Sequence, residues 1–342
     1  MKRLLAIILS AITVLATSLF ISGCGQNPDT FDIYMPDGAP ALALSKLMVD
    51  DEKLGVDAKY HVVTSSTIRN YIVNESADIA ILPVTAATKL CGNGDKYKIL
   101  ASVTNGNIFV IGKGTGATLA DLVGKKVAVA NLADFPGLVF KALLNKNTIP
   151  YTTINAEDSA DTTKVNLVGI TGTAVKASLD IYDYVVAPQP AATVATASTD
   201  GAEIRMDVQA LWGGDMVQAV AVIKASLANN TTLINNFLTA LAKTTNEWIV
   251  TNKTAAVDSI NAHFVDNATS TLKAQTLNPV SVAGSNFKVV TYIDAEFATG
   301  DNALLVSLDQ FKTRVNNMIT SFSALNITPS PVGTVSDAFY IA

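Results

Sequence analysis

Five short polar segments carry residue types that could bind a small molecule, and each comes between a predicted strand and a predicted helix. They are Met35-Pro36-Asp37-Gly38, Thr64-Ser65-Ser66-Thr67, Pro83-Val84-Thr85, Asp134-Phe135-Pro136-Gly137 and Gln189-Pro190. A helix N-terminus offers unpaired N–H groups and the positive end of the helix dipole, and hydroxyl groups add further donors. Ordinary helix capping is the better explanation of any single segment. The hypothesis of a site for a small anion or a polar heterocycle therefore depends on finding five of them in one chain.

Motifs for catalysis and for metal binding are missing from the sequence. The body of the chain has two histidines, His61 in a predicted strand and His263 in a predicted helix, and no paired His or Cys residues at metal-ligand spacing. There is no G-x-S-x-G motif, and residues 112–116 lack the last glycine spacing of the dinucleotide fingerprint. We therefore expect no catalytic residue, no metal and no cofactor. An enzyme would have to find its base among Asp37, Asp134 and His61.

The composition is that of a chain that can fold with a large core. Of 342 residues, 49% are hydrophobic and 15% are charged, and the net charge at pH 7 is −5. This length supports one large domain or two of medium size, and the low charge argues against disorder. The acidic balance, without a run of basic residues, argues against nucleic-acid binding, which needs Lys and Arg to offset phosphate charge.

The first residues have the order of a bacterial export signal. Lys2 and Arg3 precede a long uncharged apolar run. Ile21-Ser22-Gly23-Cys24 then resembles the lipobox of bacterial lipoproteins, in which the cysteine receives a diacylglycerol and becomes the mature N-terminus. We predict a signal peptide over 1–23, a lipid on Cys24 and a tether over 24–30, which places the protein at the outer face of the cell membrane. The alternative is an uncleaved membrane anchor followed by a coincidental cysteine.

Cys91 is the other cysteine of the chain and follows an apolar helical stretch. If Cys24 carries a lipid, no intramolecular disulfide can form. We therefore expect Cys91 to be a small core residue.

Apolar strands alternate with helical segments along the first two thirds of the chain. The predicted strands cover 31–35, 58–63, 78–82, 98–103, 108–111, 126–130, 184–187, 204–206 and 218–223. The predicted helices between them cover 39–49, 68–73, 83–90, 119–123, 138–145, 173–179 and 190–197, and the strand near 204–206 continues into 208–212. Thr64 to Thr67 are expected to cap the helix over 68–73. This rhythm predicts an α/β protein with mainly parallel sheets covered by helices on both faces.

The last third of the chain has a mostly helical pattern. Leu233, Phe237, Leu241 and Trp248 are expected on one apolar helical face. Further helices are predicted over 254–264, 269–277 and 303–319.

Several of these segments together resemble a known family. The segments 121–129, Pro136-Gly137 and 182–192 look like the second lobe of type II periplasmic substrate-binding proteins, and 35–40 and 78–83 are similar to first-lobe loops of the same family. The resemblance is to the branch that serves ABC importers of nitrate, sulfonates, taurine and thiamine pyrimidines. It covers roughly residues 31–250.

The resemblance implies a type II periplasmic-binding-protein fold, with two lobes that are each a mainly parallel sheet flanked by helices. We expect two hinge crossovers, near 104–107 and 210–213, and a ligand bound between the lobes. Lobe 1 would comprise 31–105 plus 213–342, and lobe 2 would comprise 106–212. The resemblance also implies a monomer, held at the membrane by its lipid, that delivers its ligand to the permease and ATPase subunits of an ABC transporter.

The expected ligand-binding residues lie in the polar segments and at the crossovers. They are Met35, Asp37, Gly38, Ala39, Thr64, Ser65, Ser66, Thr85, Asn105, Asn107, Phe135, Pro136, Gly137, Gln189 and Trp212. Relatives commonly carry Glu-Pro where this chain has Gln189-Pro190, so one negative charge is missing from this edge of the expected site. The cysteine-rich motif of pyrimidine synthases that share the fold is absent, which argues against an enzyme.

The body of the chain offers few cations for an anionic ligand. Its arginines are Arg69, Arg205 and Arg314, and of these Arg69 could face the ligand, although exposure on a helix surface is the better expectation. A dicarboxylate would usually be bound by a bidentate Arg. We therefore expect a small monoanion or a neutral polar compound.

Tyr34, Phe135 and Trp212 border the expected site and could stack on a flat ring, although each could equally be a core residue. The sequence does not decide between sulfonate-like and pyrimidine-like ligands. Two alternatives to a transport protein stay open. One is an enzyme of the same fold acting on a pyrimidine or pyridoxal compound, and the other is a lipoprotein that senses or scaffolds without transport.

Overall fold

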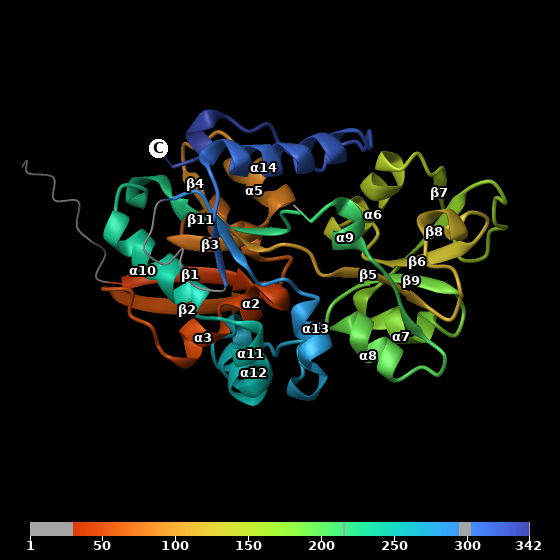
Figure 1. The fold of residues 1–342 in the computed structure, drawn as a ribbon. Coiled ribbons are helices and arrows are strands. Elements are labelled where there is room, and N and C mark those ends of the chain that lie inside the picture. The colour runs from red at the N-terminus through yellow and green to blue at the C-terminus, as the bar shows by residue number, and fades with distance from the viewer. Residues whose placement is uncertain (1–29, 215, 294–301, 342) are drawn as a thin grey trace, which may run out of the picture.

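The computed structural model describes residues 30–214, 216–293 and 302–341, which form two α/β lobes that lie side by side (Figure 1). The predicted signal peptide, Cys24 and all but the last residue of the predicted tether lie outside these residues. Within the described ranges, no helix is both long and apolar enough to span a bilayer. The expected fold class, two lobes that each consist of a sheet flanked by helices, is confirmed.

The first sheet has seven strands within the described residues, in the order β13-β12-β4-β11-β3-β1-β2. Their bounds are β1 (Thr30–Pro36), β2 (Asp57–Val63), β3 (Ile79–Pro83), β4 (Tyr97–Thr104), β11 (Ala219–Lys224), β12 (Val289–Thr291) and β13 (Ala303–Leu305). β1 pairs in parallel with β2 and β3. β11 pairs antiparallel with β3 and β4, because the chain re-enters this lobe at the edge where those strands end.

The second sheet is built from the strands between the two crossovers, in the order β10-β5-β9-β6-β8-β7. Their bounds are β5 (Ile108–Gly112), β6 (Lys126–Ala130), β7 (Tyr151–Ile154), β8 (Val165–Ile170), β9 (Tyr184–Pro188) and β10 (Glu203–Asp207). β6 to β9 run parallel to one another, and β5 is antiparallel to both β9 and β10.

The helices cover both faces of each sheet (Figure 1). Those of the first two thirds are α2 (Ala39–Ala43), α3 (Ser45–Val49), α4 (Ile68–Val73), α5 (Val84–Cys91), α6 (Phe135–Lys146), α7 (Val175–Ser178), α8 (Ala191–Ala197) and α9 (Val208–Trp212), with short 3-10 turns η1 (Leu119–Leu122) and η2 (Gly172–Ala174). The later ones are α10 (Thr231–Ala242), α11 (Asn246–Thr251), α12 (Lys253–Ala262), α13 (Pro279–Ala283) and α14 (Leu308–Ser323), with the 3-10 turns η3 (Ala225–Leu227), η4 (Val265–Asn267), η5 (Ala274–Thr276) and η7 (Asp337–Phe339).

Several predicted helices differ from the observed ones. The helix predicted over 39–49 is interrupted at Leu44, whose ψ of 2° departs from the helical value and divides it into α2 and α3. Trp248 does not continue the helix of Leu233 and Phe237, because Thr245 caps a new helix, α11, by accepting a hydrogen bond from the Trp248 N–H at 3.1 Å.

The helix predicted over 269–277 is wrong, and its start is an irregular segment instead. The Ser270 hydroxyl and both the N–H and the hydroxyl of Thr271 donate to the Asp37 carboxylate, which holds this segment in a non-helical course. The helix predicted over 303–319 begins as strand β13 and becomes helical only at Leu308, after the capping residue Ser307. The strands β7 and β8 were not predicted.

The core continues from one lobe into the other. One buried cluster runs from Tyr97 in the first sheet, through Phe311 and Phe322 of α14, to Phe135 and Phe140 of α6 in the second lobe. Each such side chain contributes about 1.5–3 kcal/mol when it is fully buried. The lobes therefore share apolar packing on the side where α14 lies over α6 (Figure 1).

Candidate ligand site between the two sheets

The strand directions bring the predicted polar segments to the two edges that face each other. The chain leaves the first sheet at Thr104, the end of β4, and enters the second at Ile108, the start of β5 (Figure 1). β1, β2 and β3 therefore end at the edge that borders the second lobe. Since β9 is antiparallel to β5, β9 and its parallel neighbours end at the edge that borders the first lobe. All five predicted segments follow strand ends of this kind.

Four of the helices that begin at these edges have no side-chain cap, namely α2, α4, α5 and α6. At α8 the Gln189 side chain accepts from the Thr193 N–H, and at α9 the Asp207 side chain accepts from the Ala210 N–H. The predicted capping of α4 by the segment Thr64 to Thr67 is therefore wrong. The Thr64 hydroxyl contacts the hydroxyls of Ser66 and Thr67 instead, at 3.2 and 3.1 Å. Elsewhere, α11 and α14 are capped by Thr245 and Ser307, whereas α3 and α12 have no side-chain cap. The starts of α2, α4, α5 and α6 leave main-chain donors at the strand ends.

A chain of amide groups crosses the junction. The Gln218 Nε2 group donates to Asn107 Oδ1 at 2.9 Å, and Asn107 Nδ2 donates to the main-chain oxygen of Gln189 at 3.4 Å. The Gln189 N–H in turn donates to the Asn107 carbonyl at 2.7 Å. The Gln218 N–H donates to the Thr104 carbonyl at 3.0 Å. These four residues therefore connect the end of β4, the start of β11, the first crossover and the end of β9.

Buried polar atoms without a partner among the described residues gather at the same place. They are Thr104 Oγ1, Gln189 Nε2, Gln209 Oε1 and Gln218 Oε1. Thr104 is 0% and Gln189 3% exposed. The amide orientations follow from the neighbours, because Gln189 Oε1 accepts from the N–H and the hydroxyl of Thr193 at 3.2 and 2.9 Å. The junction thus presents one unpaired amide donor, two unpaired amide acceptors and one hydroxyl.

Two predicted site residues fasten the C-terminal part of the chain to the first lobe. Asp37 accepts hydrogen bonds from the N–H and hydroxyl of Thr271 at 2.7 and 2.8 Å. Asn105 Nδ2 donates to the Lys288 carbonyl, and Asn105 Oδ1 accepts from the Ser102 hydroxyl at 2.6 Å. The polar groups of Asp37 and Asn105 are therefore engaged in tertiary contacts.

The predicted aromatic residues pack against other parts of the protein. Phe135 makes an edge-to-face contact with Phe322, with ring centroids 5.8 Å apart. Trp212 is buried, its carbonyl accepts from Lys146 Nζ at 2.7 Å, and the same ammonium lies 5.4 Å from its ring centroid. Tyr34 stacks between two rings on one face of the first sheet, those of His61 and Tyr71 at 4.3 and 4.2 Å.

The other predicted residues are spread over both edges of the junction. Met35 and Ala39 are buried, Thr64, Ser65 and Ser66 are exposed, and Thr85 and Pro136 are half-buried. Gly38 adopts a φ of 98°, a left-handed value that favours glycine, and a Cβ built there would meet no atom within 4 Å. Gly137 lies against the Leu132 backbone, where a Cβ would approach the carbonyl oxygen to 2.1 Å.

Sequence reasoning missed Gln218 and Gln209 as candidate site residues. A signal for Gln218 does exist, since it is the lone polar residue in the apolar run from Met216 to Ile223. It also missed Thr171 and Thr173, because β8, which they follow, was not predicted. Their hydroxyls contact each other at 3.1 Å at the edge of the second sheet.

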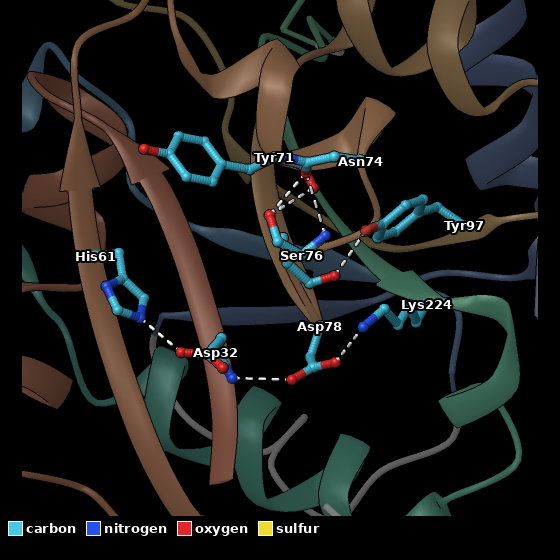
Figure 2. A network of polar contacts seen from close by, with 9 residues as sticks. Asp32, His61, Tyr71, Asn74, Ser76, Asp78, Tyr97 and Lys224 are labelled. Atoms are coloured by element: carbon cyan, nitrogen blue, oxygen red, sulfur yellow. Dashed lines mark hydrogen bonds and ion pairs between the residues drawn. The ribbon is translucent and has the colours of Figure 1, made fainter. Parts of the chain in front are cut away.

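Several ionisable groups among the described residues form ion pairs away from the junction. Figure 2 shows one such network, in which His61 Nε2 lies 2.7 Å from Asp32 and Lys224 Nζ donates to Asp78 at 2.8 Å. Arg205 pairs with Glu203 at 3.1 Å, and Arg69 is exposed on α4. The described residues contain no group of three or more His, Cys, Asp or Glu that could hold a metal ion.

The fold is that of the two-lobed substrate-binding proteins of ABC importers. A structure of an ABC transporter protein from Parabacteroides distasonis superposes with a TM-score of 0.63 at 15% identity, over 91% of this chain and 98% of that one. The periplasmic aliphatic sulphonate binding protein SsuA from Escherichia coli superposes with a TM-score of 0.59 at 13% identity, over 90% of each chain.

A zinc-bound ligand-binding component of an ABC-type import system from Staphylococcus aureus gives a TM-score of 0.55 at 12% identity, over 91% of this chain and 97% of that one. No protein-family model matches the sequence, and no curated protein matches it either. The likeness to these proteins is therefore one of fold.

Proposed function

We propose that this protein is the substrate-binding component of an ABC importer, which captures a small polar solute between its two lobes and delivers it to a permease. The observation that carries the proposal is the polar junction itself. Strand ends of both sheets, helix starts without side-chain caps and the linked side chains of Asn107, Gln189 and Gln218 meet there. Ligand sites of open α/β sheets lie at such strand ends.

The proposed lobes are residues 31–105 plus 213–342 and residues 106–212. The two crossovers between them supply a hinge, and Gly213 and Gly214 in the second crossover have φ values of 110° and 86° with no atom near a built Cβ. Binding would then be coupled to closure of the lobes around the solute, a motion that a few such residues can absorb. The proposed location is the outer face of the cell membrane, with a lipid anchor at Cys24.

A binding and uptake experiment tests this function. The full chain, purified in detergent, is titrated by calorimetry with nitrate, methanesulfonate, taurine, thiamine pyrimidines, amino acids and nucleobases. We expect saturable binding of one chemical class, no conversion of the bound compound, and loss of its uptake in cells that lack the protein.

The other outcomes separate the alternatives. Binding with unchanged uptake would favour a sensor or a scaffold. Recovery of a chemically altered compound would establish an enzyme. Binding of no compound would remove the support for a solute-binding role. The anchor is tested separately, since mass spectrometry of the protein from membranes should find an acylated N-terminal cysteine at residue 24.

A further inference from the structure

We propose that the ligand of this site is an uncharged molecule that carries both a hydrogen-bond donor and a hydrogen-bond acceptor, such as a lactam, a carboxamide or a nucleobase edge. This inference rests on the proposed solute-binding function and specifies its substrate class. It follows from which polar atoms at the junction lack partners, and from their donor or acceptor character.

The donor character is assigned at Gln189. Its Oε1 accepts from the N–H and hydroxyl of Thr193, and turning the amide would set its NH2 group against the Thr193 N–H and lose that bond. The unpaired atom is therefore Nε2, which can only donate. With 3% of the residue exposed, this donor has little access to water in the present arrangement of the lobes.

The acceptor character is assigned at Gln218 through Asn107. Asn107 Nδ2 donates to a carbonyl, that of Gln189, so Asn107 Oδ1 must face Gln218. Gln218 consequently presents Nε2 to Asn107 and leaves Oε1 unpaired. Gln209 repeats this pattern, because its Nε2 donates to the Gly214 carbonyl at 2.8 Å and its Oε1 has no partner among the described residues.

These atoms discriminate against simple anions. Nitrate and an alkanesulfonate have acceptor oxygens only, so they could satisfy Gln189 Nε2 but would place negative charge beside the acceptor oxygens of Gln209 and Gln218. A buried charge without a partner also costs more than a buried neutral group. A lactam or nucleobase supplies an N–H for the amide acceptors and a C=O for the amide donor, while the Thr104 hydroxyl can serve either role.

The same unpaired atoms favour opening of the lobes when no ligand is bound. Buried polar groups that lack partners destabilise the conformation that buries them. Opening of the lobes would give these atoms access to water, whereas closure around a complementary ligand would give them partners. Ligand binding and closure of the lobes are therefore coupled through the polar junction.

The test compares uncharged and anionic probes on the full chain. Calorimetry is run with uracil, cytosine, nicotinamide and 2-pyrrolidinone, and with nitrate and methanesulfonate at the same concentrations. We expect at least one uncharged probe to bind and the anions not to bind. Binding of the anions alone overturns the ligand class but leaves a solute-binding function standing. Binding of neither set overturns the ligand class, and the solute-binding function is overturned as well if no compound of the wider titration binds.

Substitutions at the junction test whether the probe binds there, when they are compared with a substitution elsewhere in the protein. Thr104→Val replaces an unpaired hydroxyl by a methyl group, so the melting temperature of the empty protein should rise while affinity for the bound probe falls about fivefold to tenfold. Thr244→Val is the matched control, since Thr244 Oγ1 is also buried and unpaired but lies in the turn between α10 and α11. It should raise the melting temperature without changing affinity.

A third variant tests the donor. Gln189→Glu keeps an oxygen for Thr193 and converts the free donor into an acceptor, and we expect affinity to fall at least tenfold. Equal affinities of the Thr104→Val and Thr244→Val proteins, together with unchanged affinity of Gln189→Glu, would overturn the proposal.

Discussion

At the scale of single residues, neighbours decide whether a polar side chain is available to a ligand. Asp37 and Gln189 are both polar residues at strand ends, and both were expected in the site. The Asp37 carboxylate is occupied by Ser270 and Thr271, whereas Gln189 keeps one amide donor unpaired. Both side chains follow the end of a strand and both can accept hydrogen bonds, so the neighbouring groups distinguish a structural tie from a binding group.

The Asp78 carboxylate should be important for stability, because it joins three strands at the far end of the first sheet (Figure 2). It accepts from the Asp32 N–H at 3.0 Å and from Lys224 Nζ at 2.8 Å, and its side chain is 10% exposed. Asp78→Ala leaves both donors unpaired, and we expect urea unfolding to show a loss of about 2–3 kcal/mol.

The matched control for Asp78 is Asp57→Ala, which removes an exposed ion pair with Lys53 at 3.2 Å. Exposed pairs of this kind contribute about 0–1 kcal/mol. A loss at Asp78 no larger than the loss at Asp57 would contradict the structural role of the Figure 2 network.

The Cys91 thiol should be unreactive in the folded protein. Burial raises the pKa of Cys91 to about 12, so almost no thiolate is present at pH 8. We expect a thiol-specific reagent to modify Cys91 only after unfolding in urea. A lipid on Cys24 would leave the native protein without a reactive thiol, and one rapidly modified cysteine at residue 24 would contradict the proposed anchor.

At the scale of elements, C-terminal helices bind the two lobes together. α14 contacts α6 of the second lobe through Phe322 and Phe135, and α13 contacts α8. Figure 1 shows α13 between the lobes and α14 extending toward α6. Gly284, directly after α13, lies so close to the second lobe that a Cβ would come within 2.9 Å of the Phe109 ring. The final third of the chain therefore takes part in the junction rather than only covering the first sheet.

A methyl group added at Gly106, in the first crossover, should lower the stability of the protein. This residue has a φ of 112°, and a built Cβ would lie 2.0 Å from Gln209 Oε1 and 3.1 Å from Gln209 Cβ. Gly106→Ala adds this clash to the strain of a left-handed backbone, so we expect a loss of about 2–4 kcal/mol in urea unfolding.

Gly201→Ala is the control for Gly106, because Gly201 has a φ of 72° with no atom within 4 Å of a built Cβ. Backbone strain alone should cost about 1–2 kcal/mol there. The double variant Gly106→Ala/Gln209→Ala should recover part of the difference. Equal losses at Gly106 and Gly201 would show that the crossovers are not in close contact.

At the scale of the whole molecule, an apolar contact and a polar junction connect the same two lobes. The apolar contact runs through α14 and α6, and the polar junction runs through Asn107, Gln189 and Gln218. Apolar packing is gained whenever the lobes approach, whereas the polar groups need partners to be buried without cost. Closure should therefore depend on a ligand that satisfies the polar side.

Tryptophan fluorescence should report lobe movement selectively. The chain has two tryptophans. Trp212 lies in the second crossover with Lys146 Nζ 5.4 Å from its ring, and Trp248 lies in α11 with Lys46 Nζ at 5.3 Å. A binding probe should shift the emission of the Trp248→Phe protein and leave the Trp212→Phe protein unchanged. A shift confined to Trp248 would contradict a hinge at this crossover.

Local sequence determined most of the secondary structure and the fold class. Apolar runs bounded by turn residues predicted all the strands of the first two thirds except β7 and β8. β7 has a mixed burial pattern without a buried residue, and its Thr-rich sequence shows no apolar run. Strand formation in such segments depends on a partner strand, and a partner is not visible in the local pattern.

Tertiary structure alone decided the direction of β11 and the availability of polar groups. The sequence of β11 is equally compatible with parallel and antiparallel pairing, and its direction is set by where the chain returns from the second lobe. In the same way, Thr193 orients Gln189 and Asn107 orients Gln218. Thr193 is a local partner, four residues after Gln189, whereas Asn107 and Gln218 are 111 residues apart. The folded structure therefore determines which donors and acceptors remain for a ligand, because each polar atom can be satisfied only where the fold places a complementary one.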